Sequence, residues 1–335
     1  MRPGFSFTVP KRKLAAPKFQ ITRALFNSPR DASVIMENCI TKWNSPEHNA
    51  YLRRWAMDGT QQRAQGWGEP EARSLISIGP HLQRMPLYAV MAEASALIQA
   101  GAESLKPQPI LKSDLPSPEG IVLFQYPLTA IDIHLREYKI IAAMWIQSID
   151  GENNHTVSIL QFTDWHDLEN VWRYKNLTHH MPTLSLLHVQ TASYDLLYAP
   201  PAEDDHGEYV PVEARQSAMH HMAFMQAFWA FVQQKVVVAE DHVHAREVRK
   251  RLAKDSYRLG NLKMVHLRSI ARGSVTPSDS PHHVDWKKRW VVRGHWRQQW
   301  YKSLQNHRQI WVWPYVKGPE NMPLYERKTV YTVAR

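Results

Sequence analysis

Cysteine is almost absent from this chain of 335 residues, since Cys39 is the single one. A disulfide within the chain is therefore impossible, which favours a reducing compartment, and we expect a cytoplasmic protein. The sequence also lacks a run of about 20 apolar residues, so we expect no membrane-spanning helix and no membrane partner. Its first residues have neither the apolar run nor the small-residue cleavage site of a secretory signal.

Motifs of the large nucleotide-dependent and hydrolytic enzyme classes are missing as well. The chain has no GxxxxGK[ST] phosphate loop, no GxGxxG dinucleotide motif and no GxSxG nucleophile turn. Its 18 histidines form no HExxH pattern. The nearest approach to a metal cluster is Asp241, His242 and His244, and three such neighbours on one helix would not face a common point. We therefore expect neither a metal nor a cofactor.

Acidic residues are scarce at both ends of the chain. Residues 1–30 contain seven Lys or Arg and no acid. Because Pro3, Pro10 and Pro17 interrupt any helix there, we expect a basic, loosely ordered arm over residues 1–30. Residues 246–335 contain 20 Lys or Arg and 6 Asp or Glu, a net +14, whereas the whole chain carries +10, which leaves −4 for the rest. This asymmetry indicates a separate role for the last quarter of the chain.

The hydrophobic pattern predicts helices first and strands later. Residues 28–59 and 84–103 have helical periodicity, and residues 214–234 are apolar nearly all round, which is typical of a buried central helix. Strand-like runs follow a proline-rich connector. They cover residues 121–126, 138–149 and 156–162, with four more after residue 262.

These patterns predict an α+β fold with helices packed on an antiparallel sheet and a basic, tryptophan-rich β part at the C-terminus. We expect a helical and sheet part over residues 31–245 and a basic β part over residues 246–335. Whether the two parts share one core stays open.

The segment "DWKKRWVVRGHWRQQW", residues 285–300, combines four tryptophans with five Lys or Arg and one acid. In a strand, alternate side chains face opposite sides. The even positions from Trp286 to Trp296 are mostly aromatic or apolar, and the odd positions are almost all basic. The sequence therefore predicts a strand with a buried tryptophan face and a cationic outer face, paired with a second strand over residues 307–316.

A row of like charges is repulsive, and such a row usually persists because an anion is bound. Guanidinium groups bind phosphate through two parallel hydrogen bonds. We therefore expect nucleic acid as the partner, with RNA or single-stranded DNA favoured because no recognition-helix motif is evident. The predicted nucleic-acid-binding residues are Lys287, Arg289, Arg293, Arg297, Arg308 and Lys317.

Two other functions stay open. A metal-independent ribonuclease of the toxin type would need an acid, a base and a cation, and His295 and His307 with neighbouring arginines could supply them. Alternatively, exposed tryptophans would bind a protein partner. Whether the protein is an enzyme is thus undecided, with binding favoured over catalysis.

The residues from Gly294 to Leu324 resemble the C-terminal segment of an uncharacterised family of actinobacterial and actinophage or prophage proteins. The shared pattern is "GHWR", then "HR" and a tryptophan, then "PYVKGP" and "PL". The upstream "LPSPEGIVLF", residues 115–124, is similar to an "LPSPxGF" strand of the same group. The resemblance implies a phage, prophage or host-defence setting, and it implies no particular chemistry.

Overall fold

The computed structural model describes residues 24–62, 73, 75–106, 108–131, 135, 137–149, 155–164, 184–203, 209–234, 237–267, 289–292, 294–303, 305–313, 315–318 and 323. Most of the predicted N-terminal arm, residues 1–23, lies outside these ranges. Its last residues belong to the fold, because Phe26 is buried and the backbone N–H of Leu25 donates to the carbonyl oxygen of Gln125 at 2.8 Å.

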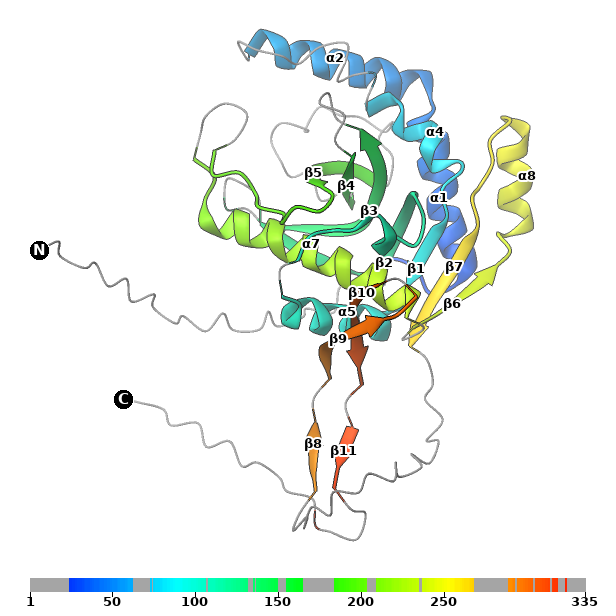
Figure 1. Cartoon of the computed structure of the whole chain (residues 1–335). Coiled ribbons are helices and arrows are strands. Elements are labelled where there is room, and N and C mark those ends of the chain that lie inside the picture. The colour runs from blue at the N-terminus through cyan, green and yellow to red at the C-terminus, as the bar shows by residue number, and fades with distance from the viewer. Residues whose placement is uncertain are drawn as a thin grey trace, which may run out of the picture.

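A seven-stranded sheet forms the centre of the fold, in the order β5-β4-β3-β2-β1-β7-β6 (Figure 1). β1 is parallel to both of its neighbours, and the other strand pairs are antiparallel. The predicted α+β class is therefore confirmed, with a mixed sheet. The strands are β1 (Leu87–Val90), β2 (Glu119–Ile131), β3 (Glu137–Ile149), β4 (His155–Asp164), β5 (Leu184–Ser193), β6 (Val237–His242) and β7 (Leu262–Leu267).

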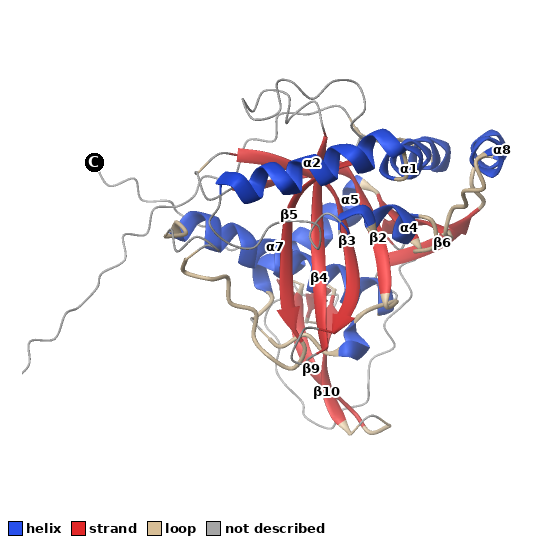
Figure 2. Cartoon of the chain, turned by 90° about the horizontal axis from the view of Figure 1, so that it is seen from above, coloured by secondary structure: helices blue, strands red, loops and turns tan. Residues whose placement is uncertain are grey.

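Helices cover both faces of this sheet (Figure 2). α5 (Ala92–Ser104) and α7 (Val212–Gln233) pack on one face. The other face carries α1 (Pro29–Trp43), α2 (Pro46–Gln62), α4 (Ile78–Leu82) and α8 (Arg246–Lys254). Strands covered on both sides need apolar side chains at successive positions. The buried run from Ile121 to Phe124 in β2 meets that requirement.

α7 is the buried central helix that the sequence predicts. Its Phe228 ring lies 5.6 Å from Tyr88 and 6.0 Å from Trp145, and its Trp229 ring lies 6.1 Å from Trp145, all between ring centroids. These edge-on aromatic contacts fix α7 against β1 and β3. None of the described helices is long and apolar enough to cross a membrane.

The expectation of one helix over residues 84–103 is wrong. Leu87–Val90 forms β1, and the helix α5 begins only at Ala92. All four β1 residues are buried between β2 and β7. Pairing on both edges and burial on both faces stabilise the strand more than local helix propensity stabilises a helix.

The boundary expected at residue 245 falls inside the main sheet. β6 precedes this boundary and β7 follows it. The two strands pair antiparallel, with Val237 opposite Leu267 and His242 opposite Leu262. β7 also pairs with β1. α8 and β7 of the basic last quarter therefore share the core of the residues before them.

A buried histidine in α2 makes the stability of this fold depend on pH. His48 is 1% exposed, and within the described residues neither ring nitrogen has a hydrogen-bond partner. Its ring lies edge-on to Trp43, with 4.8 Å between centroids. Burial, aided by the charge of Lys42, lowers the pKa of His48 from 6.5 to about 4.

We expect the free energy of unfolding to fall as the pH drops from 6.5 to 4. In this window the unfolded chain binds a proton at His48 and the folded chain does not, which costs up to about 3 kcal/mol. His48→Phe, which keeps a ring beside Trp43, should reduce this loss. Urea unfolding of both proteins at pH 7.5 and pH 5 measures the difference, and an unchanged pH dependence in the variant would contradict the assignment.

Candidate nucleic-acid interface

The basic, tryptophan-rich segment forms a hairpin that lies against α5 and α7 (Figure 1). β9 (His295–Tyr301) pairs antiparallel with β10 (Asn306–Val312), and we call these two strands the hairpin. β8 (Trp290–Val292) and β11 (Tyr315–Lys317) form a separate pair beyond it. Both pairs have the same register, since Val292 is opposite Tyr315 as His295 is opposite Val312, and residue 293 between β8 and β9 lies outside the described residues.

Two tryptophans attach the hairpin to the body. Trp296 and Trp311 are opposite each other in the register, and both pack on Phe231 of α7, at 5.1 and 5.5 Å between ring centroids. Trp296 Nε1 donates to the carbonyl oxygen of Gly101 at 2.9 Å. A Cβ on Gly101 would lie 2.7 Å from the Phe231 ring, so a glycine is needed there for this approach. The predicted structural role of Trp296 agrees with this packing.

An amide side chain completes the attachment. Gln234, which follows α7, donates through Nε2 to the carbonyl oxygen of Gln309 at 2.6 Å. It accepts through Oε1 from the backbone N–H of Trp311 at 2.8 Å. Gln234 thus binds the β10 backbone much as a neighbouring strand would, and it fixes which face of the hairpin points outward.

The strand register divides the hairpin into two faces. The inner face bears the two anchoring tryptophans, together with Gln298, Trp300, His307 and Gln309. The outer face bears the cations, and its residues are His295, Arg297, Gln299, Tyr301, Arg308, Ile310 and Val312.

Two of the predicted phosphate-binding residues share the outer face. Arg297 is exposed and Arg308 is half-buried. Arg308 is opposite Gln299, which places it diagonally from Arg297, about 7–8 Å away. The Arg297 guanidinium donates to Gln299 Oε1 at 2.8 Å. A single phosphate or two consecutive phosphates fit this spacing.

Acidic side chains are nearly absent around these cations. Residues 289–318 contain six Lys or Arg and no Asp or Glu. Asp114 of η1 (Lys112–Asp114) interacts with Arg308 from outside the hairpin. Burial raises the pKa of Asp114, and the charge of Arg308 opposes that rise. Arg308 is thus close enough to Asp114 for their charges to interact, whereas Arg297 is exposed.

Aromatic rings lie at the far end of the hairpin. Trp300 is 44% exposed and Tyr301 is 37% exposed. The Trp300 ring contacts His307 across the strands, at 4.9 Å between centroids. Trp300 is on the inner face but extends beyond the part anchored on α7, so its exposure follows from its position at the tip.

The remaining predicted residues are spread more widely. Lys317 is exposed on β11, and Arg289 is half-buried and donates its backbone N–H to the carbonyl oxygen of Pro323 at 3.0 Å. Lys287 and Arg293 lie outside the described residues. The structure thus brings Arg297 and Arg308 together, and it places Lys317 on the second strand pair and Arg289 immediately before β8.

The two histidines proposed as an acid–base pair are not brought together. His295 is opposite Val312, and His307 is opposite Trp300, five residues away along β10. The register therefore puts them on opposite faces and at opposite ends of the hairpin. They do not face one substrate atom in this arrangement, which general acid–base catalysis by a pair requires.

The residues weighed as metal ligands also make separate contacts. Asp241 accepts from Lys263 Nζ at 2.7 Å, and His242 lies 3.7 Å from Glu240. His244 is buried and bonded elsewhere. Within the described ranges no cluster of three or more His, Cys, Asp or Glu could hold a metal ion.

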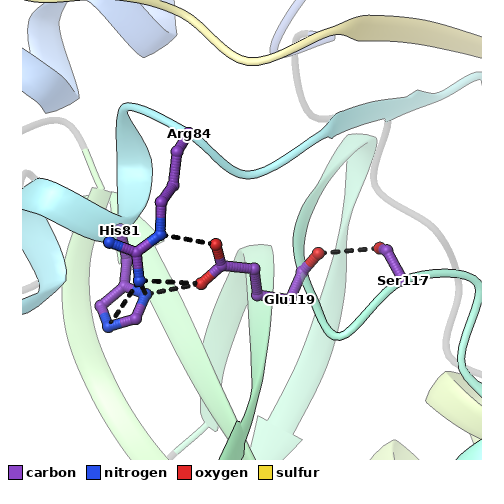
Figure 3. Close-up of polar contacts among 4 residues, drawn as sticks. All are labelled: His81, Arg84, Ser117 and Glu119. Atoms are coloured by element: carbon purple, nitrogen blue, oxygen red, sulfur yellow. Dashed lines mark hydrogen bonds and ion pairs between the residues drawn. The ribbon is translucent and has the colours of Figure 1, made fainter.

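Sequence analysis missed an ion-pair cluster at the start of β2 (Figure 3). Glu119 accepts from Arg84 Nε at 2.7 Å, and its other oxygen lies 2.6 Å from His81 Nδ1. Burial tends to raise the pKa of Glu119, but the hydrogen bonds from Arg84 and His81 outweigh burial and lower it. An acid held ionised in this way ties α4 to β2 and is poorly suited to accept a proton.

In the sequence, the motif "LPSPEG" contains Glu119 and could have pointed to this cluster. Ser117 Oγ donates to the carbonyl oxygen of Glu119 at 2.7 Å, and Trp145 Nε1 donates to the carbonyl oxygen of Ser117 at 3.0 Å. A Cβ on Gly120 would lie 2.3 Å from the Trp145 ring. The motif therefore has a structural explanation in the packing of Trp145.

Comparisons with known proteins add little to this geometry. No protein-family model and no curated protein matches the chain. A crystal structure of AcrVA2 is similar over 86% of this chain and 93% of its own, with 14% sequence identity and a TM-score of 0.37. A similarity at this level identifies neither a family nor a ligand for this chain.

The anchor predicts unequal effects of two tryptophan substitutions. Trp311 is 8% exposed, so Trp311→Ala should lower the free energy of unfolding by about 3–5 kcal/mol, as large core truncations do. Trp300→Ala at the exposed tip should cost less than about 1 kcal/mol. Denaturant unfolding of both variants tests this, and equal losses would show that the anchor is placed wrongly.

Proposed function

We propose that the protein binds single-stranded nucleic acid, RNA or DNA, through the outer face of the hairpin. The observation that carries the proposal is a cationic face, with Arg297 and Arg308 on adjacent strands, inside a 30-residue segment with six Lys or Arg and no acid. Charge of one sign on a fixed surface attracts polyanions and raises the rate of their association. The phage or host-defence setting implied by the sequence resemblance remains part of this proposal.

The exposed ring on the same face supports a single strand over a duplex. Tyr301 follows Arg297 and Gln299 on alternate positions of β9, so its ring lies beyond the cations on the outer face. Unpaired bases stack on aromatic side chains, whereas bases in a duplex are already stacked. In this arrangement the arginines bind phosphates and Tyr301 stacks a base.

The proposal predicts that Arg297→Gln with Arg308→Gln weakens binding of an oligouridine strand at least about tenfold. Two lost phosphate contacts should also flatten the dependence of log affinity on log salt by about 1.4. Fluorescence anisotropy across a salt series measures both quantities.

A matched control removes two exposed cations from the body, Arg54 of α2 and Lys139 of β3. The double variant R54Q/K139Q lowers the net charge equally and should bind within about twofold of the wild type. Equal effects of the two double variants would mean that net charge alone attracts the strand, and the hairpin would lose its assigned role.

Stacking makes a separate prediction for Tyr301. Tyr301→Ala should weaken binding by about 5- to 150-fold, since one base–aromatic stack is worth about 1–3 kcal/mol. Tyr301→Phe keeps the ring and should restore most of the affinity. If Tyr301→Phe binds as weakly as Tyr301→Ala, the hydroxyl rather than the ring contacts the ligand.

Protein binding is the second candidate, because the exposed apolar side chains on the two strand pairs favour it. Trp300, Tyr315 and Val316 are 44%, 45% and 51% exposed. Tryptophan and tyrosine are enriched at protein interfaces. Binding of a polypeptide that is insensitive to salt and to the arginine substitutions would favour this second function.

A further inference from the structure

α8 is a basic helix that touches the body along a narrow apolar stripe. Only Val248 and Leu252, one helical turn apart, are buried in the core. Two ion pairs to α1 add to this contact: Arg251 Nε to Glu37 Oε1 at 2.5 Å, and Arg30 Nε to Glu247 Oε1 at 2.9 Å. Glu247, the acidic residue of α8, is therefore already paired with Arg30 of α1.

The segment before α8 is held by a buried histidine. His244 Nδ1 lies 2.9 Å from Ser33 Oγ of α1, and His244 Nε2 lies 2.7 Å from the carbonyl oxygen of Gly260. Arg249 Nε donates back to the carbonyl oxygen of His244 at 3.2 Å. α8 is thus fixed at its start as well as along its buried stripe, and its outward side chains are displayed on a rigid element.

Three cations form a row on the outward face. Arg246, Lys250 and Lys254 are spaced four residues apart, about 6 Å along the axis, and all three are exposed. Among the described residues, no acidic side chain pairs with any of them. Like charges at this spacing destabilise a helix by roughly 0.2–0.5 kcal/mol per pair. A bound polyanion would remove that repulsion.

The chemistry of the row favours phosphates of a nucleic acid over a lipid surface. A helix that lies on a membrane turns an apolar face toward the lipid. The apolar residues of α8 face the protein core instead, and the outward row is made of long cationic side chains. Contacts of this kind read the backbone and not the base sequence.

We propose that α8 is a second phosphate-binding surface for the nucleic acid that the hairpin binds, which makes the interaction bipartite; this inference rests on the proposed function. α8 packs on the sheet face covered by α1, whereas the hairpin packs on α7 across the sheet. Figures 1 and 2 both place α8 and the hairpin in separate regions of the molecule. A strand that contacts both surfaces has to pass round the sheet.

This separation predicts a dependence on ligand length. A sheet with helices on both faces is about 30 Å thick, because each of the three layers is about 10 Å, whereas six stacked nucleotides span about 20 Å. A ligand of a few nucleotides bound at the hairpin therefore does not reach α8. A long strand gains affinity from the second contact through its high effective concentration. Substitutions in α8 should therefore affect long strands and spare short ones.

The test measures binding of a 6-nucleotide and a 40-nucleotide oligouridine to the full chain. Lys250→Gln with Lys254→Gln keeps good helix formers and removes two charges. We expect at least about tenfold weaker binding of the 40-nucleotide strand, a salt slope lower by about 1.4, and less than a twofold change for the 6-nucleotide strand. The control is again R54Q/K139Q, which should leave both affinities within about twofold.

The outcomes separate this inference from the proposed function. If R297Q/R308Q weakens binding of both strands and K250Q/K254Q changes neither affinity, the hairpin function stands and the α8 proposal is overturned. An acidic protein would then be the remaining ligand class for α8. If K250Q/K254Q weakens binding of the short and the long strand equally, the bipartite arrangement is also overturned. If R297Q/R308Q has no effect on either length, the hairpin function fails whatever α8 does.

Discussion

The stacking of Trp296 and Trp311 on Phe231 is the contact on which the proposed interface depends. A two-stranded hairpin is marginally stable alone, so its orientation has to come from the body. The two tryptophans use one face of the hairpin for this attachment, and Gln234 binds the β10 backbone beside them. Because strand faces alternate, the anchoring of one face determines that Arg297 and Arg308 lie on the opposite, outer face.

The sheet divides the basic last quarter of the chain between two surfaces. α8 lies on one face, β7 then enters the sheet between β1 and β6, and the hairpin lies on the other face. The described cations of α8 and of the hairpin are therefore displayed on two separate surfaces and not in one patch. A polyanion that reaches round the body would be attracted at both surfaces.

Sequence reasoning succeeded where one local pattern dominates. The alternation along the strands predicted which side chains share a face. The helical pattern that begins at residue 28 predicted the start of α1, where Ser28 Oγ accepts from the N–H of Asp31. It failed at Leu87–Val90, where pairing to strands far along the chain overrides helical periodicity. The Gln234 anchor, 75 residues from Gln309, gave no local signal.

The histidine pair shows how register limits such reasoning. His295 and His307 both belong to basic, aromatic strands, and only the turn between the strands decides whether they share a face. The register places them on opposite faces. The faces of the two arginines do not depend on the turn. Arg297 is one residue from Trp296 on β9 and Arg308 is three residues from Trp311 on β10, so each arginine faces away from the anchoring tryptophan of its own strand.

The central claim is that the outer face of the hairpin contacts nucleic acid, and photo-crosslinking tests it most directly. The protein would be irradiated with a 4-thiouridine-labelled strand, digested, and the crosslinked peptides identified by mass spectrometry. The account predicts crosslinks within residues 295–312, with Tyr301 among the modified positions, and their loss in R297Q/R308Q. Crosslinks confined to other parts of the chain, unchanged in that variant, would contradict it.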